Sequence, residues 1–278
     1  MLGQILPAKN IDEITPYISV LGNLQDGRSP HIGCKKKCCI RLTNHQKSNR
    51  KITSLGLILP YLNSYYLFEA TPDIEEQLES IESNSKYLLD GIFLTHAHIG
   101  HYSGLIFFVR EALGSINIKT YTMPRLESLI RENGPWSQLV EQKNIVLKKL
   151  INQTSIQISD KVKVIPFIVP HRDEYSETVG YKIIGPNKTA LFIPDIDKWE
   201  RWNTKIEELI KDVDIAWLDD TFFDQFEIKN ISISEIPHPL VIETMKRLNN
   251  MPQVDRKKIY FIHLNHTNPL INLFSQES

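Results

Sequence analysis

The chain has 278 residues, and its apolar share of 41% is enough to form the core of one large domain or two small ones. Its 32 basic residues nearly balance its 33 acidic residues, which argues against nucleic acid or another polyanion as a partner held by overall charge. No apolar run approaches the ~20 residues that span a bilayer, so we expect no transmembrane segment.

The beginning of the chain, Met1 to Asp12, lacks the basic and apolar regions of a signal peptide. This favours a cytoplasmic protein. A secreted or periplasmic protein stays open if a signal peptide has been removed. The sequence does not indicate the oligomeric state.

The first predicted strand leads to a cluster of cysteines. Residues Tyr17 to Leu21 are typical of a strand, and the turn-rich run Gln25 to Pro30 follows. All three cysteines of the chain then fall within six residues: Cys34, Cys38 and Cys39. Thiolates at this spacing predict a small structural zinc site, with His31 as a candidate fourth ligand. The alternatives are a reduced surface cluster and one disulfide with a spare thiol.

Two paired strands are expected next, over residues 55–59 and 65–68. The second strand runs into a helix that extends through Ile81. Pro72 suits the first turn of this helix and Thr71 suits its cap. Asp73 is expected to be a favourable negative charge at the helix N-terminus.

Three of the nine histidines lie within six residues, at His96, His98 and His101, directly after the buried strand 92–94. A helical pattern follows and ends at Gly114. In an extended segment, residues two apart face the same way, so His96 and His98 can bind one metal ion. His101 lies past the turn, where it could serve a second ion nearby. The carboxyl end of a strand is also where α/β sheets bind ligands.

Later strand ends carry further candidate ligands. His171 follows the apolar strand 162–169 and repeats the geometry of the first cluster, so we expect it to be the third ligand of the first ion. Asp195 follows strand 190–193, where a carboxylate could bridge two ions and hold their water. Asp197 is the fallback for this role, or the cap of a helix over residues 199–210.

The remaining candidates are substrate contacts and proton-handling groups. Arg172 could steady an anionic substrate, although a surface salt bridge explains it equally well. His238 could contact the substrate or belong to a turn. The last strand, 258–262, ends in His263, with His266 three residues further on. His266 is an alternative ligand, or a group that orients a ligand or moves protons.

The run His96-Ala97-His98-Ile99-Gly100-His101 resembles the His-x-His-x-Asp-His signature of the metallo-β-lactamase superfamily. The resemblance implies a single α/β domain over 1–278, built as a four-layer αββα sandwich with two mixed sheets. It also implies the ligand sets: His96, His98 and His171 for the first ion, and His101, Asp195 and His263 for the second, with Asp195 bridging. Gly100 replaces the family's aspartate, so the second ion is expected to bind weakly or not at all. Glu69 stands where the superfamily often carries an aspartate near its metals.

A narrower resemblance is to the family of pyrroloquinoline quinone biosynthesis protein B. It covers Tyr17 to Pro269 and rests on five short runs, at 25–27, 71–73, 170–176, 194–197 and 263–269. That family departs from the full histidine signature, whereas this chain keeps all three histidines.

The expected function is that of a metal-dependent hydrolase. A metal-activated water would attack an ester, phosphodiester or amide of a small-molecule or peptide substrate, with Asp195 and His266 as the catalytic candidates. Zinc suits the ligands best, as one or two ions, and iron or manganese is also compatible. The alternatives are an iron-dependent oxidase or hydroxylase, implied by the narrower resemblance, and a non-enzymatic binding protein, which the loss of the aspartate at Gly100 would allow.

Overall fold

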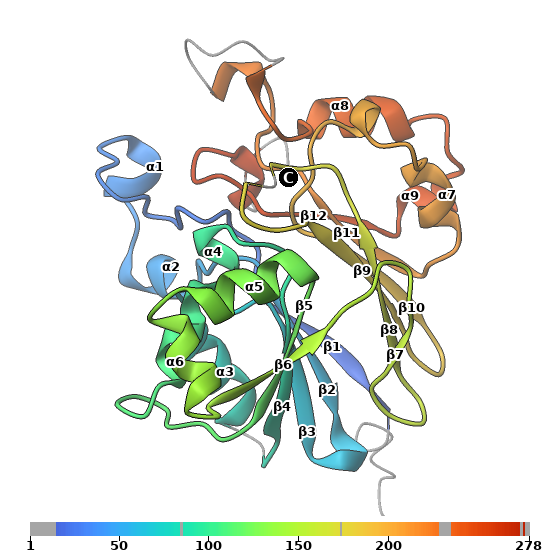
Figure 1. Ribbon diagram of the computed structural model, residues 1–278. Helices are drawn as coiled ribbons and strands as arrows, with labels where there is room; N and C mark the ends of the chain where they lie inside the picture. Colours follow the sequence, from blue (N-terminus) through green and yellow to red (C-terminus); the bar gives the residue numbers. More distant parts are fainter. Residues whose placement is uncertain (1–14, 84–85, 173, 228–234, 273–274, 276–278) are drawn as a thin grey trace, which may run out of the picture.

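The computed structural model describes residues 15–83, 86–172, 174–227, 235–272 and 275, so Met1 to Asp12 and Asp173 lie outside the described residues. Two six-stranded sheets face each other, and helices cover the outer face of each (Figure 1). This is the expected four-layer αββα sandwich. Among the described residues, no helix is both long and apolar enough to cross a bilayer.

The first sheet has the strand order β1-β2-β3-β4-β5-β6. Strands β1, β2 and β3 pair in antiparallel fashion, and β3 to β6 run parallel, so the sheet is mixed. The bounds are β1 (Tyr17–Gly22), β2 (Ser54–Leu59), β3 (Ser64–Phe68), β4 (Leu88–Phe93), β5 (Ile118–Thr122) and β6 (Ile145–Lys149).

The second sheet has the order β12-β11-β10-β9-β8-β7 and is also mixed. Strands β10, β11 and β12 run parallel, while β7 to β10 alternate in direction. The bounds are β7 (Ile156–Gln157), β8 (Lys163–Ile168), β9 (Val179–Ile184), β10 (Thr189–Ile193), β11 (Ile215–Asp219) and β12 (Ile259–Ile262).

Three layers of buried side chains separate the four layers of backbone. Because side chains alternate along a strand, Leu55 and Leu57 of β2 face the second sheet, whereas Ile58 faces the helices. The layer between the sheets is rich in stacked aromatic rings, including Phe68 and Phe93, whose centroids lie 5.1 Å apart. The two outer layers seal each sheet against its helices.

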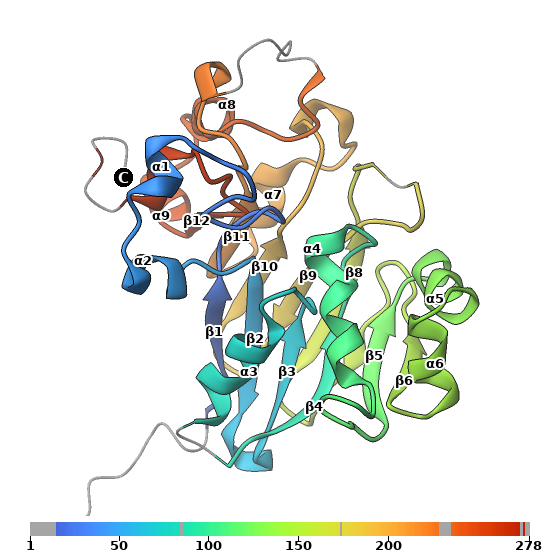
Figure 2. The same ribbon diagram turned by 90° about the vertical axis from the view of Figure 1, so that its left-hand side faces the viewer.

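The helices are short, and they fall into two groups. Helices α3 to α6 belong to the half of the chain that forms the first sheet, and α7 to α9 belong to the half that forms the second (Figures 1 and 2). Helices α1 and α2 lie in the long connection between β1 and β2. The bounds are α1 (Lys37–Ile40), α2 (Asn44–Ser48), α3 (Ile74–Glu82), α4 (Ile99–Tyr102), α5 (Pro124–Glu132), α6 (Trp136–Glu141), α7 (Ile206–Lys211), α8 (Val241–Leu248) and α9 (Gln253–Arg256).

Several local expectations were wrong. The helix expected after the histidines is only α4, followed by a 3₁₀ helix at Ser103–Phe108. Gly104 lies in this 3₁₀ helix, and its backbone packs directly on the segment after β3. A Cβ atom at position 104 would lie 2.0 Å from the carbonyl oxygen of Thr71. Thr71 does not cap α3, because Asp73 occupies the cap position. The Thr71 hydroxyl accepts a hydrogen bond from the backbone N–H of Asp73 at 3.0 Å.

Two further segments also differ from expectation. The helix expected over 199–210 is broken into a 3₁₀ turn at Trp199–Arg201 and helix α7, with the poor helix formers Asn203 and Thr204 in between. Strand β6 was not predicted. These differences leave the sheet edges intact, and the carboxyl ends of β4, β8, β10, β11 and β12 all lead into the candidate ligands.

Candidate metal centre

Three histidines meet one aspartate at the carboxyl edge of the sheets. The Nε2 atoms of His96 and His171 lie 3.2 Å from the Oδ2 and Oδ1 atoms of Asp195, respectively. Nδ1 of His98 lies 3.7 Å from Oδ2 of Asp195 and 3.4 Å from Nε2 of His171. One ligand atom from each of these four residues lies within 4.8 Å of all the others. The structure thus brings together the residues that the sequence analysis assigned to the first ion.

A second group adjoins the first across Asp195. Its members are Asp26, His101 and His263, whose ligand atoms also lie within 4.8 Å of one another. Nε2 of His101 and Nε2 of His263 lie 3.8 and 3.9 Å from Oδ2 of Asp195. Asp195 therefore has both groups around it, as a bridging carboxylate requires. We call the two groups together the histidine centre.

Buried atoms without hydrogen-bond partners show whether the residues fit a metal. Nε2 of His96 and Oδ1 of Asp195 are buried, and neither has a hydrogen-bond partner among the described residues. An unpaired buried polar group costs about 1–3 kcal/mol, and both atoms point into the first group. Imidazole nitrogens around a carboxylate are a donor set that zinc, iron and manganese all accept, so the residues fit a divalent metal ion.

Glu69 lies behind the histidines, not among the ligand groups. Its Oε1 accepts a hydrogen bond from the Thr95 hydroxyl at 2.5 Å, and the Thr95 oxygen lies 2.8 Å from Nδ1 of His96. Because the single hydroxyl proton goes to Glu69, Nδ1 of His96 must carry its own proton and donate it to Thr95. Nε2 of His96 is therefore unprotonated, and its lone pair faces Asp195. This is the tautomer that can bind a metal. Oε1 of Glu69 also lies 3.2 Å from Nδ1 of His101.

The same arrangement recurs behind His263. Thr221 donates its hydroxyl proton to Oδ1 of Asp219 at 2.8 Å, and the Thr221 oxygen lies 2.9 Å from Nδ1 of His263. In the neutral form of His263, Nε2 is therefore unprotonated, and its lone pair faces Asp26 and Asp195. Two carboxylate–threonine–histidine chains, one from each sheet, thus orient the two halves of the centre.

His238 is buried beside the centre. Its Nδ1 lies 2.9 Å from Oδ2 of Asp219 and 3.2 Å from Oδ1 of Asp195. The two carboxylates outweigh the effect of burial and raise the pKa of His238 to about 10. His238 therefore carries a positive charge at neutral pH in the metal-free protein, which suits the predicted contact to a substrate.

Charges in the centre are strongly coupled. Burial alone would raise the pKa of Asp195, but His171, His263 and His238 together hold it well below the usual range. Burial lowers the pKa of His96 well below its usual value, and the nearby His101 adds to this effect. His101 behaves in the opposite way: burial lowers its pKa, but Glu69 and Asp26 together raise it well above the ordinary value.

Three predicted residues lie elsewhere. Arg172 is exposed beside His171, and its role stays a prediction. Asp197 turns away from the centre: its Oδ2 pairs with Nη1 of Arg201 at 2.6 Å. His266 is grouped with the cysteines and not with Asp195, and its expected catalytic role stays a prediction.

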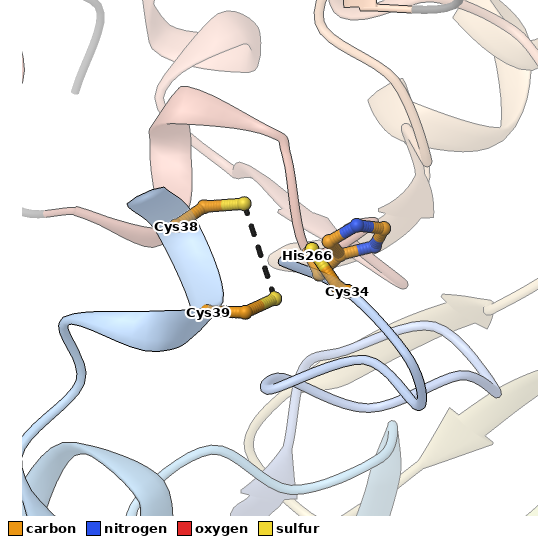
Figure 3. A group of neighbouring side chains, drawn as sticks. All are labelled: Cys34, Cys38, Cys39 and His266. Carbon is orange, nitrogen blue, oxygen red and sulfur yellow. Dashed lines mark hydrogen bonds between the residues drawn. The ribbon is translucent and has the colours of Figure 1, made fainter. Parts of the chain in front are cut away.

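Cys34, Cys38, Cys39 and His266 form a second candidate metal site, which we call the cysteine cluster (Figure 3). One ligand atom from each lies within 4.8 Å of the others, and Sγ of Cys38 and Sγ of Cys39 are 3.9 Å apart. All three thiols are free, which is contrary to the disulfide alternative. His266, and not the expected His31, completes the set; the ring of His31 instead lies 4.5 Å from that of His266.

Sequence reasoning missed the roles of Asp26 in the centre and of Asp219 beside it. Asp26 was placed in a turn-rich loop and in the run 25–27 of the narrower resemblance, without a role as a ligand, and nothing local shows that this loop reaches the other sheet's strand ends. Asp219 was seen at the end of a strand but given no role. A carboxylate at the carboxyl end of a central parallel strand, one strand away from Asp195, was the signal that could have identified it.

Comparisons with known proteins agree with this geometry. The family model described as the beta-lactamase superfamily domain matches residues 65–264, well over half of the chain. No curated protein sequence matches the chain closely enough to count as a relative. The solved structure of Zn²⁺-bound PqqB from Methylobacterium extorquens is similar, with a TM-score of 0.75 and 19% identity over 94% of this chain and 93% of that one.

Two more solved structures share the fold at greater distance. One is a diphosphatase from the PhnP family, with a TM-score of 0.65 and 20% identity over 92% of this chain and 89% of that one. The other is the short form of human tRNase Z, with a TM-score of 0.58 and 15% identity over 89% of this chain and 92% of that one. With the family model, the fold and the histidine signature in agreement, the chain belongs to the β-lactamase superfamily and has the metallo-β-lactamase fold.

Proposed function

We propose that this protein is a metal-dependent hydrolase whose active site is the histidine centre. One observation carries the proposal: His96, His98, His171 and Asp195, which come from three separate strand ends, present ligand atoms within 4.8 Å of one another. Strand-end residues from both halves of the chain converge here, which also supports one domain over 1–278. Isolated structural histidines would not need to converge on a shared carboxylate.

Different residues would bind the ions, orient the imidazoles and contact the substrate. His96, His98, His171 and Asp195 would hold one ion, and His101 and His263 would share Asp195 with a second. Such ions, when bound, lower the pKa of a water molecule towards about 7 and polarise the bond to be cleaved. Glu69 and Asp219, acting through Thr95 and Thr221, keep the imidazoles in the binding tautomer. His238, held by Asp219, and Arg172 would contact an anionic group of the substrate.

We propose an ester, phosphodiester or amide as the substrate, with phosphodiesters tested first. The two positively charged candidates, Arg172 and His238, favour a substrate with an anionic group, and phosphate is such a group. By their names, the diphosphatase and the tRNase Z that share this fold act on phosphate-containing substrates. This is a second reason to test phosphodiesters first.

We propose further that the cysteine cluster holds a structural zinc ion. Three thiolates and one imidazole are a complete four-ligand set for zinc. Burial raises the pKa of Cys39 to about 12, so this thiol stays protonated without a metal, and a bound ion would supply the charge that stabilises the thiolate. The zinc ion would then connect two surface segments, one around Cys34 to Cys39 and one at His266, that belong to no common strand.

An iron-dependent oxidase or hydroxylase is the second candidate. The similarity of the whole chain to PqqB favours it, and imidazoles with one carboxylate also suit ferrous iron. A non-enzymatic binding protein on the same scaffold is the third candidate.

Elemental analysis after anaerobic purification, combined with a hydrolysis screen of phosphodiesters, esters and amides, separates these candidates. The hydrolase proposal predicts zinc or manganese in the histidine centre, and turnover that disappears in His96→Ala and persists in His45→Ala, a change of an exposed histidine in α2. Iron with substrate-dependent oxygen uptake would replace the hydrolase with the oxidase. A metal-loaded protein without any turnover would favour the binding protein.

A further inference from the structure

We infer that Asp26 takes the place of the aspartate that the superfamily signature carries at position 100, so that the second ion site is complete despite Gly100. The inference rests on the proposed metal centre. It reverses the expectation from the sequence that the second ion binds weakly or not at all. It also gives a function to a loop residue that lies 74 positions away from the signature.

The first observation is that Asp26 occupies the space of the missing side chain. A Cβ added to Gly100 would lie 2.6 Å from both Cγ and Oδ1 of Asp26 and 2.9 Å from its Cα. Contacts this short are not found for real Cβ atoms, so position 100 can carry no side chain while Asp26 is there. Glycine at position 100 is therefore the condition for Asp26 to enter the centre.

The second observation is the placement of the carboxylate. Oδ1 of Asp26 lies 3.1 Å from Nε2 of His101 and 3.3 Å from Nε2 of His263. Both nitrogens also face Asp195, at 3.8 and 3.9 Å from its Oδ2. Asp26, His101 and His263 thus present ligand atoms within 4.8 Å of one another, and Asp195 faces both imidazoles, so two imidazoles and two carboxylates are available to a divalent ion.

The third observation is that the loop is fixed to the segment that carries His263. The backbone N–H of Gln25 donates to the carbonyl of Leu264 at 3.0 Å, and the N–H of Leu264 donates to the carbonyl of Asn23 at 2.9 Å. Two reciprocal hydrogen bonds of this kind hold Asp26 and His263 as one unit. Arg28, two residues further on, forms an ion pair with the buried Asp73.

Counting metal ions in four variants tests the inference. The variants are Asp26→Asn, Gly100→Asp, the exchange of both (Asp26→Gly with Gly100→Asp) and, as a matched control, Asp160→Asn, an exposed carboxylate in the turn between β7 and β8. Each purified full-length protein is equilibrated with buffered Co²⁺ and measured by elemental analysis. The thiolate-to-cobalt charge-transfer absorption reports the cysteine cluster separately, and a thermal melt confirms folding.

The inference predicts that wild type and Asp160→Asn bind two ions in the histidine centre. Asp26→Asn should keep the first ion and bind the second at least about tenfold more weakly, since even the partners that orient ligands contribute 10–100-fold. The exchange variant should regain the second ion, and Gly100→Asp alone should not bind it more tightly than wild type, because the two carboxylates compete for one space.

Three outcomes would overturn the inference. One is an Asp26→Asn protein that binds the second ion as tightly as wild type. Another is a folded exchange variant that keeps the first ion and does not regain the second. The third is a wild-type centre that holds one ion only, which leaves the hydrolase proposal standing, whereas a wild-type centre without any ion refutes both.

Discussion

The histidine centre and the cysteine cluster are built in opposite ways. The histidine centre takes most of its ligands from the ends of buried strands in both sheets, and His96, His101, Asp195 and His263 are almost fully buried. The cysteine cluster takes its ligands from the segment that contains α1 and from the segment after β12, and Cys34 and Cys38 are only partly buried. Packing therefore orders the residues of the first site without a metal, whereas the proposed zinc ion would hold the segments of the second site together.

The two sites nevertheless share chain segments. Asp26 lies in the connection that continues to the three cysteines, and His263 lies three residues before His266. The segment after β1 and the segment after β12 are thus joined at both sites. A substitution in the cysteine cluster should therefore weaken binding at the second ion site and leave binding at the first ion site largely unchanged.

The largest effect is expected for Asp195→Asn. This change removes the negative charge shared by the two halves of the centre, so both ions should bind more than about a hundredfold more weakly, beyond the 10–100-fold typical of partners that only orient ligands. Elemental analysis after dialysis against a metal buffer measures the loss. Asp197→Asn, two residues along the chain and paired with Arg201, is the matched control and should keep both ions. Equal metal content in the two variants would remove Asp195 from the centre.

Loss of the cysteine cluster should be the next largest effect, and it should appear in stability. The double change Cys34→Ser with Cys39→Ser removes two proposed zinc ligands, and a metal at a thousand times its Kd contributes about 4 kcal/mol to the folded state. Thermal melts with and without a chelator measure the difference, and the variant should no longer respond to zinc at the cluster. The first ion of the histidine centre should stay bound, and the second should bind more weakly. Equal weakening of both ions would contradict a selective link between the cysteine cluster and the second ion site.

Removing either threonine hydroxyl should have a smaller effect, and each removal should weaken the binding of a different ion. Thr95→Val should weaken the first ion by roughly 10–100-fold and Thr221→Val the second, because each change releases the tautomer of one histidine, His96 or His263. Thr122→Val is the control, since the buried Thr122 hydroxyl has no hydrogen-bond partner among the described residues. Metal titration of each variant gives the two affinities. Thr95 and Thr221 variants that weaken the same ion would contradict the assignment.

The last expected effect concerns pH. His101 has a pKa raised well above its ordinary value, and in the metal-free protein carboxylates raise that of His263 to about 9 against the effect of burial. An ion needs neutral imidazoles, so binding at the second position must displace protons below these pKa values, and its affinity should rise by about tenfold per pH unit for each displaced proton until about pH 9. His96 has a lowered pKa and is already neutral, so the first ion should change less. Competition titrations at pH 7 and pH 9 test this; identical pH dependence of the two ions would contradict it.

The sequence predicted the strand ends and every residue of the centre except Asp26, because those features are local. Continuous apolar runs before His96, His171, Asp195 and His263 mark buried strands, and ligands at strand ends follow from that pattern. Asp26 could not be found in this way, because its approach to Gly100 depends on how a long loop crosses between the sheets. The same holds for His266, which lies close to His263 in sequence but turns towards the cysteines.

Anomalous diffraction at the zinc absorption edge, from crystals of the zinc-loaded protein, tests the central claim most directly. The account predicts one peak at about 2.0–2.2 Å from the ligand atoms of His96, His98, His171 and Asp195. Zinc bound in the crystal with no peak at that position, or with peaks only at the cysteine cluster, would contradict it.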